Sequence, residues 1–403
     1  MNLEIPRKFG PLINQAQQVA REVFLPISRK YDRAEHSYPK ELDMFASIMD
    51  GMNDGAADGG AGAGRLARAD DDANGSANRN GTNMKTVLGL TELCWGDVGL
   101  ALSIPRQGLG NSAIAAVANE EQLARLGNTW AAMAITEPGA GSDSAAIRTT
   151  ASRDGDDYII NGEKIYVTAG ERADAVVVWA SLDRSKGRAA IKSFVVEKGT
   201  PGMTVERLEK KLGIRASDTA AIRFDNCRVP AANLLGDPEI SVDKGFAGAM
   251  QTFDNTRPVV AGMAIGVARA ALDRTYALMA KNHQTMSYRA QTWTQTAVER
   301  ELQLLEAEWD AARLLTLKAA WMADNGQPNS KEASMAKAKA GRVGNQVTLR
   351  CVELCTSLGY SEVELLEKWA RDSKILDIFE GTQQIQLLII ARRLLGKSSA
   401  ELK

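Results

Sequence analysis

A glycine-rich segment in the middle of the chain, residues 134–151, carries side chains that could hold a ligand. It reads AITEPGAGSDSAAIRTTA and contains the hydroxyl groups of Thr136, Ser142 and Ser144. Because glycine has no side chain, such a loop can bring backbone N–H groups close to a phosphate or a flat polar ring. Most loops of this composition are only connections, so the segment alone does not identify a function.

An acidic residue near the C-terminus could act as a base. Glu380 precedes Gly381 and Thr382 within residues 371–396, between two helical stretches. A carboxylate at a helix boundary is more often a cap or a solvated charge than a catalytic group. The chemistry open to Glu380 therefore depends on what the fold places around it.

The overall charge argues against partners that are recognised by long-range electrostatics. The 403 residues include 49 Lys and Arg against 50 Asp and Glu, and the net charge at pH 7 is −1. This balance predicts no binding to nucleic acid or to an anionic membrane surface. No apolar run approaches the roughly 20 residues that a membrane-spanning helix needs. The N-terminal MNLEIPRKFG lacks the apolar core of a signal peptide.

The cysteines indicate neither a disulfide framework nor a metal site. There are four of them, Cys94, Cys227, Cys351 and Cys355, widely scattered except for the last two. No histidine or further cysteine lies near that pair in the sequence to complete a metal site. We therefore expect reduced thiols, no bound metal and a cytoplasmic protein.

The first part of the chain, residues 1–129, has a helical pattern. Apolar residues recur at intervals of three and four over 11–33, around 84–93 and over 111–126. Residues 51–83 are rich in Gly, Ala, Asp and Asn and have almost nothing to bury. This composition predicts a flexible insertion in a helical domain.

The middle part, residues 130–238, reads as β structure. Short runs of β-branched residues alternate with turn signals such as Asp154-Gly155 and Asn161-Gly162. Strands at this spacing predict an antiparallel barrel or sandwich.

The last part, residues 239–403, is helical again, so the predicted fold class is α+β with several domains. Its amphipathic stretches are long enough for a four-helix bundle and cover 244–280, 291–324, 329–358 and 361–395. Four tryptophans at core-like positions of these stretches are expected to be buried, namely Trp293, Trp309, Trp321 and Trp369.

Five motifs in order along the chain resemble those of the acyl-CoA dehydrogenases. They are TEPGAGSD, the strand ending in YVT, KLGIRASDTA, FDNTRP and IFEGTQQIQ. The resemblance spans nearly the whole chain and is weakest before Leu88 and between Lys281 and Glu301. It implies an FAD-dependent enzyme with an N-terminal helical domain, a central β domain and a C-terminal four-helix bundle.

The resemblance also implies which residues contact the cofactor and the substrate. The residues implied to bind FAD are Met133, Ile135, Thr136, Gly141, Ser142, Tyr166, Thr168, Thr382 and Gln384. Those implied to contact the acyl-CoA are Ser142, Phe253, Asp254, Thr256, Arg257, Gly381 and Arg392.

The resemblance makes Glu380 the expected catalytic base. Some family members place a glutamate instead at the position of Thr256, so no second carboxylate competes here. Burial beside an acyl chain and a flavin would raise the carboxylate pKa toward working pH. The implied reaction removes the α-proton of an acyl-CoA, transfers the β-hydride to FAD N5 and yields a trans-2-enoyl-CoA. The electrons would pass to an electron-transfer flavoprotein.

The same residues bear on two other functions. A flavin oxidase or monooxygenase of this fold usually lacks the glutamate, which argues against that reading. A mainly structural subunit of a heteromeric dehydrogenase is disfavoured by the intact base and flavin loop.

The chain departs from the family where neighbouring subunits share FAD. Residues 281–300 contain no R-x-x-F-G motif, Glu353 replaces a glutamine, and Thr356-Ser357 replace a Gly-Gly pair. An added negative charge near a pyrophosphate and added side chains at a close approach are both unfavourable. Two assemblies therefore stay open: a homotetramer, and an α2β2 heterotetramer with a second acyl-CoA dehydrogenase-like subunit.

Overall fold

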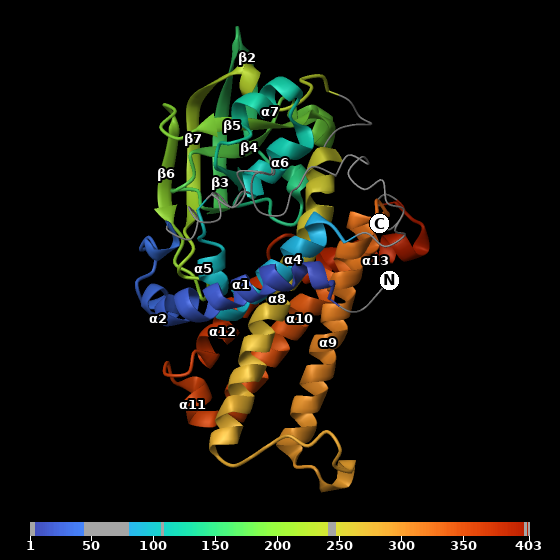
Figure 1. The fold of residues 1–403 in the computed structure, drawn as a ribbon. Coiled ribbons are helices and arrows are strands. Elements are labelled where there is room, and N and C mark those ends of the chain that lie inside the picture. The colour runs from blue at the N-terminus through green and yellow to red at the C-terminus, as the bar shows by residue number, and fades with distance from the viewer. Residues whose placement is uncertain (1–4, 44–79, 106–108, 241–246, 399–400, 402–403) are drawn as a thin grey trace.

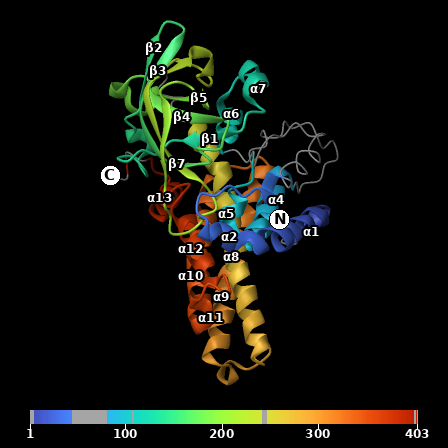
Figure 2. The ribbon, with the colours of Figure 1, turned by 90° about the vertical axis from the view of Figure 1, so that its left-hand side faces the viewer.

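The structure, a computed structural model, describes residues 5–43, 80–105, 109–240, 247–398 and 401 (Figure 1). Within residues 247–255 it describes the backbone alone. A curled sheet lies at one end of the molecule, long helices extend from the other, and the N-terminal helices cross between them (Figures 1 and 2). This arrangement confirms the predicted order of a helical part, a β part and a helical part.

The N-terminal part consists of short helices, of which the last two lie against the sheet and the others against the longer helices of the C-terminal part. Their bounds are α1 (Gly10–Val19), a π-helical turn (Ala20–Phe24), α2 (Leu25–Arg33), α4 (Thr82–Gly96), α5 (Val98–Ala101), α6 (Leu109–Val117) and α7 (Glu120–Leu126). The predicted insertion lies outside the described residues up to residue 79, and α4 begins at Thr82, inside its predicted end. The single helix predicted over 111–126 is wrong, because Asn119 caps a new helix with its side chain.

The β part is one seven-stranded sheet. Its strands are β1 (Ala131–Ala134), β2 (Thr150–Asp154), β3 (Asp157–Thr168), β4 (Ala175–Ser181), β5 (Ile191–Glu197), β6 (Met203–Leu208) and β7 (Thr219–Pro230). They lie in the order β1-β4-β2-β3-β7-β6, and β5 pairs with β4. Most pairs are antiparallel as predicted, but β1 runs parallel to β4, and β2 pairs parallel with β4 at Thr150 and Ser181. All seven residues of β4 are buried, because the sheet has apolar residues packed on both faces.

The C-terminal part has three long helices and a segmented fourth stretch. The long helices are α8 (Ala247–Lys281), α9 (Ala297–Asp324) and α10 (Ser330–Leu354). The continuous pattern predicted over 361–395 is divided into α12 (Leu366–Ser373), a 3₁₀ turn (Lys374–Asp377) and α13 (Gln383–Leu395), after the short α11 (Thr356–Tyr360). Glu380 and Gly381 interrupt it, because their φ angles of 54° and 92° are incompatible with a right-handed helix.

One of the four tryptophans expected in the core lies in solvent. Trp369 is buried, but Trp293 is 81% exposed in a 3₁₀ turn before α9. The helix begins only at Ala297, because Thr296 and Glu299 form a capping box there. The predicted core position of Trp293 is therefore wrong, because this residue precedes the helix.

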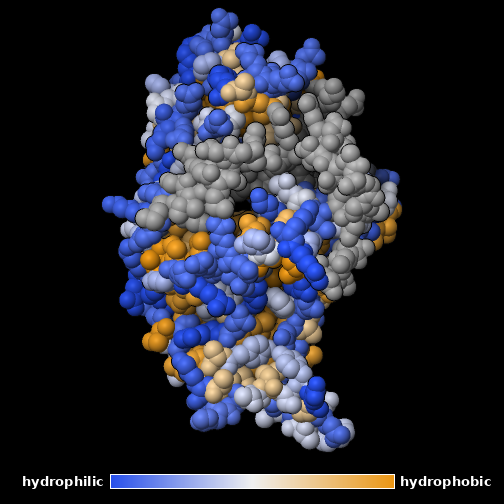
Figure 3. All heavy atoms as spheres, viewed as in Figure 1, coloured by the Kyte–Doolittle hydropathy of each residue, from blue (hydrophilic) through white to orange (hydrophobic). Residues whose placement is uncertain are grey.

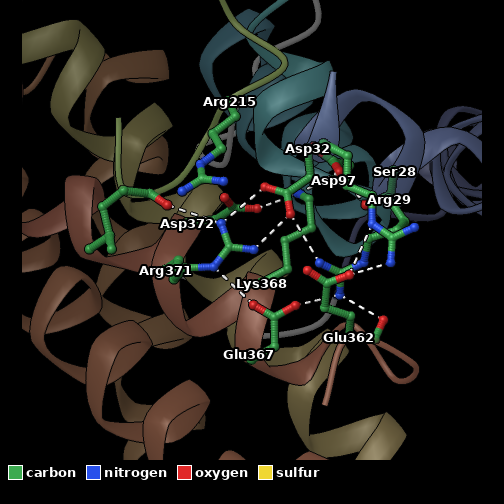
Figure 4. A network of polar contacts seen from close by, with 12 residues as sticks. Ser28, Arg29, Asp32, Asp97, Arg215, Glu362, Glu367, Lys368, Arg371 and Asp372 are labelled. Atoms are coloured by element: carbon green, nitrogen blue, oxygen red, sulfur yellow. Dashed lines mark hydrogen bonds and ion pairs between the residues drawn. The ribbon is translucent and has the colours of Figure 1, made fainter. Parts of the chain in front are cut away.

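A buried charge cluster joins the three parts of the chain (Figure 4). Lys368 of α12 donates to Asp97, the N-cap of α5, at 2.7 Å and to Asp372 at 2.5 Å. The second carboxylate also accepts the backbone N–H of Ile214, from the KLGIRASDTA segment between β6 and β7, at 2.5 Å. We call these four residues the three-part junction. A Cβ on the neighbouring Gly213 would overlap the Arg371 carbonyl oxygen. The KLGIRASDTA segment therefore needs glycine at this position to pack against α12.

The surface is largely polar on the face seen in Figure 3, with apolar residues scattered over it. None of the helices that the structure describes is both long enough and apolar enough to cross a bilayer.

Candidate active site

Glu380 lies in a short turn between the 3₁₀ segment and α13. Both Glu380 and Gly381 adopt left-handed backbone conformations. Glycine does so without strain, whereas a glutamate pays about 1–2 kcal/mol. Non-glycine residues are held in this way mainly where the surrounding structure fixes them, often at functional sites.

Hydrogen bonds from two helices fix this turn. Lys337 Nζ, from α10, donates to the Gly381 carbonyl oxygen at 2.7 Å. Gln386 Nε2, from α13, donates to the carbonyl oxygens of Glu380 and Gly381, both at 3.1 Å. Thr382 caps α13 by accepting the N–H of Ile385. The backbone around Glu380 is therefore held on both sides.

The Glu380 side chain accepts a hydrogen bond from a hydroxyl and feels the charges of two cations. Thr256 Oγ1, from α8, donates to Glu380 Oε2 at 2.8 Å. Glu380 is partly buried, and desolvation raises the pKa of its carboxyl, although the Thr256 hydrogen bond and the charges of Arg257 and Lys337 oppose the shift. A carboxylate whose pKa lies above the usual range is a stronger base once it is ionised.

Replacing Thr256 by valine is expected to move the pH profile of catalysis. The variant loses a hydrogen bond that favours the ionised carboxylate, so the pKa of Glu380 rises further. Activity that requires the ionised form is present above that pKa and lost as the pH falls through it. The acid limb of kcat/KM should therefore move up by roughly one pH unit.

A matched control is Thr316→Val in α9, where a buried hydroxyl donates to the carbonyl of its own helix at Ala312. The acid limb of the kcat/KM profile should not move in that variant. Identical acid limbs in Thr256→Val and the unmodified protein would refute this role of the hydroxyl.

The glycine-rich loop after β1 is anchored by a buried ion pair. Glu137 Oε1 accepts from Lys164 Nζ at 2.7 Å and from Thr149 Oγ1 at 2.6 Å. Lys164 also donates to the Ile135 carbonyl oxygen at 3.0 Å. Burial lowers the pKa of Lys164 to about 8 against the opposing effect of Glu137. Sequence reasoning missed Glu137 and Lys164, which are 27 residues apart and carry no local signal of pairing.

An aromatic side chain beside this loop is exposed. The β3–β7 register shifts between Lys164 and Val167, and Tyr166 within that bulge has a φ of 58°. Tyr166 is 63% exposed, although it belongs to a strand of the sheet. The loop is tied to the same strand, because the N–H of Ile165 donates to the Thr136 carbonyl at 2.9 Å. Bulges re-aim side chains next to functional sites.

These features fit the flat ring of a flavin. Tyr166 offers an exposed aromatic face, and the hydroxyls of Thr136 and Thr168 lie on partly exposed residues of the loop and the strand. A Cβ on Gly139 or Gly141 would meet nothing within 4 Å, so the loop has open space beside it.

The residues predicted from the sequence fall into two groups. The flavin-loop group comprises the exposed Gly141 and Ser142, the partly buried Met133, Thr136 and Thr168, the buried Ile135 and the exposed Tyr166. The Glu380 group comprises Thr256 and Arg257, which are buried, Gly381 and Thr382 in or beside the turn, and Gln384 and Arg392 on α13. The side chains of Phe253 and Asp254 lie outside the described residues.

The region that departs from the family pattern has its own local contacts. Glu353 forms an ion pair with Arg350, which also donates to Glu301 at 2.8 Å. Arg350 thus partly offsets the negative charge of Glu353. Thr356 has a φ of 50°, a conformation that a β-branched residue adopts only under strain.

Family models match two long segments of the chain. "Acyl-CoA dehydrogenase, middle domain" matches residues 132–227, and "Acyl-CoA dehydrogenase, C-terminal domain" matches residues 243–395.

Individual relatives give the same result. The chain is 32% identical to acryloyl-CoA reductase (NADH) of Anaerotignum propionicum over 98% of this chain and 97% of that protein. It is 39% identical to the mitochondrial short-chain specific acyl-CoA dehydrogenase of Rattus norvegicus over 67% of this chain. That match spans 64% of the length of the rat protein.

Two solved structures share the fold over nearly their full length. Butyryl-CoA dehydrogenase from Megasphaera elsdenii has a TM-score of 0.82 at 29% identity, covering 98% of this chain and 100% of that one. A structure described as the electron transferring flavoprotein of Acidaminococcus fermentans has a TM-score of 0.80 at 30% identity, with the same coverage.

Proposed function

Because the chain belongs to the acyl-CoA dehydrogenase family, we propose that it converts an acyl-CoA thioester to the trans-2-enoyl-CoA with Glu380 as the base. The observation that supports this most is the Glu380 carboxylate itself. It is held by Thr256 at 2.8 Å in a turn fixed from two helices, and desolvation raises its pKa. Such a group suits the abstraction of a weakly acidic α-proton.

Each residue of the turn has a role in this proposal. The ionised Glu380 takes the α-proton, and its backbone N–H polarises the thioester carbonyl as negative charge develops there. Arg257, buried on α8, contributes positive charge beside the carboxylate. The acyl-CoA would be contacted by Gly381, Phe253, Asp254, Ser142 and Arg392.

FAD is the proposed cofactor, and it supplies the acceptor for the β-hydride. The loop residues Met133, Ile135, Thr136, Gly141 and Ser142 would line one edge of the ring, and Tyr166 and Thr168 would lie along it. Thr382 and Gln384 would contact the remainder of the cofactor. The buried Glu137–Lys164 pair fixes the loop that these contacts need.

The partners and location complete the proposal. An electron-transfer flavoprotein is the proposed acceptor, because a chain of the same fold occurs in a structure described as that of an electron transferring flavoprotein. The cytoplasm is the proposed compartment; there the thiols of Cys94, Cys227 and Cys351, all buried, would be reduced.

A panel of acyl-CoA substrates tests the reaction. The purified protein with bound flavin is mixed with short, branched and long acyl-CoA thioesters and a dye acceptor. Short-chain substrates are expected to give the highest kcat/KM, because the relatives include a short-chain dehydrogenase and a butyryl-CoA dehydrogenase. Inactivity toward every thioester, with rapid reoxidation of the reduced protein by air, would favour an oxidase instead.

The reverse reaction belongs in the same panel. The relative that matches 98% of the chain is named an acryloyl-CoA reductase. The same base and geometry serve both directions, so a faster reduction of short enoyl-CoA by reduced flavin would assign the chain to the reductive direction.

Flavin content per protomer distinguishes the two assemblies. Full, stable occupancy in the chain purified alone would support a homotetramer. Low occupancy that rises to half of the protomers on adding a second dehydrogenase-like subunit would support the α2β2 form.

A further inference from the structure

Lys337 is a buried cation whose direct partner is a backbone carbonyl. Three lysines are fully or almost fully buried among the described residues, Lys164, Lys337 and Lys368. The first and the third contact carboxylates, at 2.7 Å and at 2.5 and 2.7 Å. Lys337 instead donates to the Gly381 carbonyl oxygen, and no carboxylate in the described part of the chain forms an ion pair with it. Burying a charge without an oppositely charged partner costs free energy. The presence of Lys337 beside the turn of Glu380 therefore needs an explanation.

The α10 face that carries Lys337 follows the segment leading to Glu380. Gly341, one turn further, lies so close to that segment that a Cβ there would be 2.9 Å from the Leu376 carbonyl oxygen. Asn345 donates to the Ser373 carbonyl oxygen at 3.2 Å, one turn later again. Residues spaced by four lie on one face of a helix. This face thus supports the chain from residue 373 to residue 381, and Lys337 holds its end.

We propose that Lys337 is a positioning residue for the reaction assigned above to Glu380. Its ammonium holds the Gly381 carbonyl so that Glu380 keeps its left-handed conformation. Its positive charge also stabilises the ionised carboxylate and the negative charge that develops on the substrate. The inference rests on the proposed function of Glu380, whereas the contact with Gly381 stands by itself.

Several charged groups act together at this point. Asp377, from the 3₁₀ turn, and Glu380 favour the charged form of Lys337, while Arg257, from α8, and burial oppose it. Burial has the larger effect and lowers the pKa of Lys337 to about 8. Below that pH the ammonium supplies its charge to the site, and Gln386 of α13 adds only neutral hydrogen bonds.

Two variants separate the hydrogen bond from the charge. Lys337→Met removes both, and kcat is expected to fall about 10- to 100-fold with little change in KM. Lys337→Gln keeps a donor, so kcat should fall less, but the acid limb of the pH profile should move up by roughly half a unit to one unit. Lys339→Gln is the matched control, because this lysine of the same helix is partly exposed and pairs with Glu308.

Infrared titration of the Glu380 carboxyl provides a readout that does not need turnover. The absorption band of this carboxyl group is identified by its loss in Glu380→Gln. The pH at the midpoint of its titration should rise in both Lys337 variants but not in Lys339→Gln. An unmoved band and an unchanged kcat in Lys337→Met would overturn the proposal for Lys337. An inactive parent protein with a shifted band would contradict the proposed reaction and leave the role of Lys337 in place.

Discussion

Replacing Glu380 by glutamine is expected to remove acyl-CoA dehydrogenation while leaving flavin and ligand binding intact. Glutamine has nearly the same shape, so the turn held by Lys337 and Gln386 should persist. The amide cannot accept the α-proton, and general base catalysis contributes about 10²- to 10⁴-fold to such rates. Anaerobic mixing with an acyl-CoA, followed by flavin bleaching, measures the loss directly.

Two comparisons make this result specific to the base. Glu121→Gln changes an exposed glutamate on α7 and should bleach at the rate of the unmodified protein. Flavin per protomer should be equal in all three proteins. Retention of normal bleaching by Glu380→Gln would show that another group removes the proton.

Replacing Lys368 by methionine is expected to cause the largest loss of stability. Lys368 is 1% exposed and lies between Asp97 and Asp372, both fully buried. Without the ammonium, two carboxylates face each other in the interior, a change that typically costs 3–5 kcal/mol. The midpoint of thermal unfolding should fall by roughly 5–10 °C.

The stability prediction has an internal check. Adding Asp97→Asn to Lys368→Met should recover part of the loss, since it removes one of the uncompensated charges. Lys30→Met, which breaks an exposed ion pair with Glu41, should leave the midpoint nearly unchanged. Equal midpoints for Lys30→Met and Lys368→Met would mean that the junction does not stabilise the fold.

Much of the architecture follows from local sequence patterns. Helical periodicity, β-branched runs and turn dipeptides predicted the order of the three parts. The predicted helix bounds are wrong where a backbone turn or a helix cap interrupts the apolar pattern. The apolar pattern continues through residues 361–395, but the left-handed Glu380 and Gly381 break the helix. The apolar pattern also extends over Trp293, but the capping box of Thr296 and Glu299 starts α9 only after it.

The groups that position the candidate site could not be predicted in this way. Lys164 and Glu137 meet across 27 residues, and Lys337 reaches Gly381 across 44. Each reads in the sequence as an ordinary solvated charge. Only the packing of β3 against the loop, and of α10 against the turn, removes these side chains from water and brings them to their partners.

The three-part junction also has a consequence for how the molecule opens. Its charges come from α5 and α12, and the Ile214 N–H ties in the segment between β6 and β7. Local unfolding of any one of these segments would leave a buried charge or carboxylate without its partner. The three segments should therefore exchange their amide hydrogens together, as one cooperative unit drawn from all three parts of the chain. The sequence divides into a helical, a β and a second helical stretch. The free energy of local unfolding, however, would be common to the segments of all three that meet at the junction.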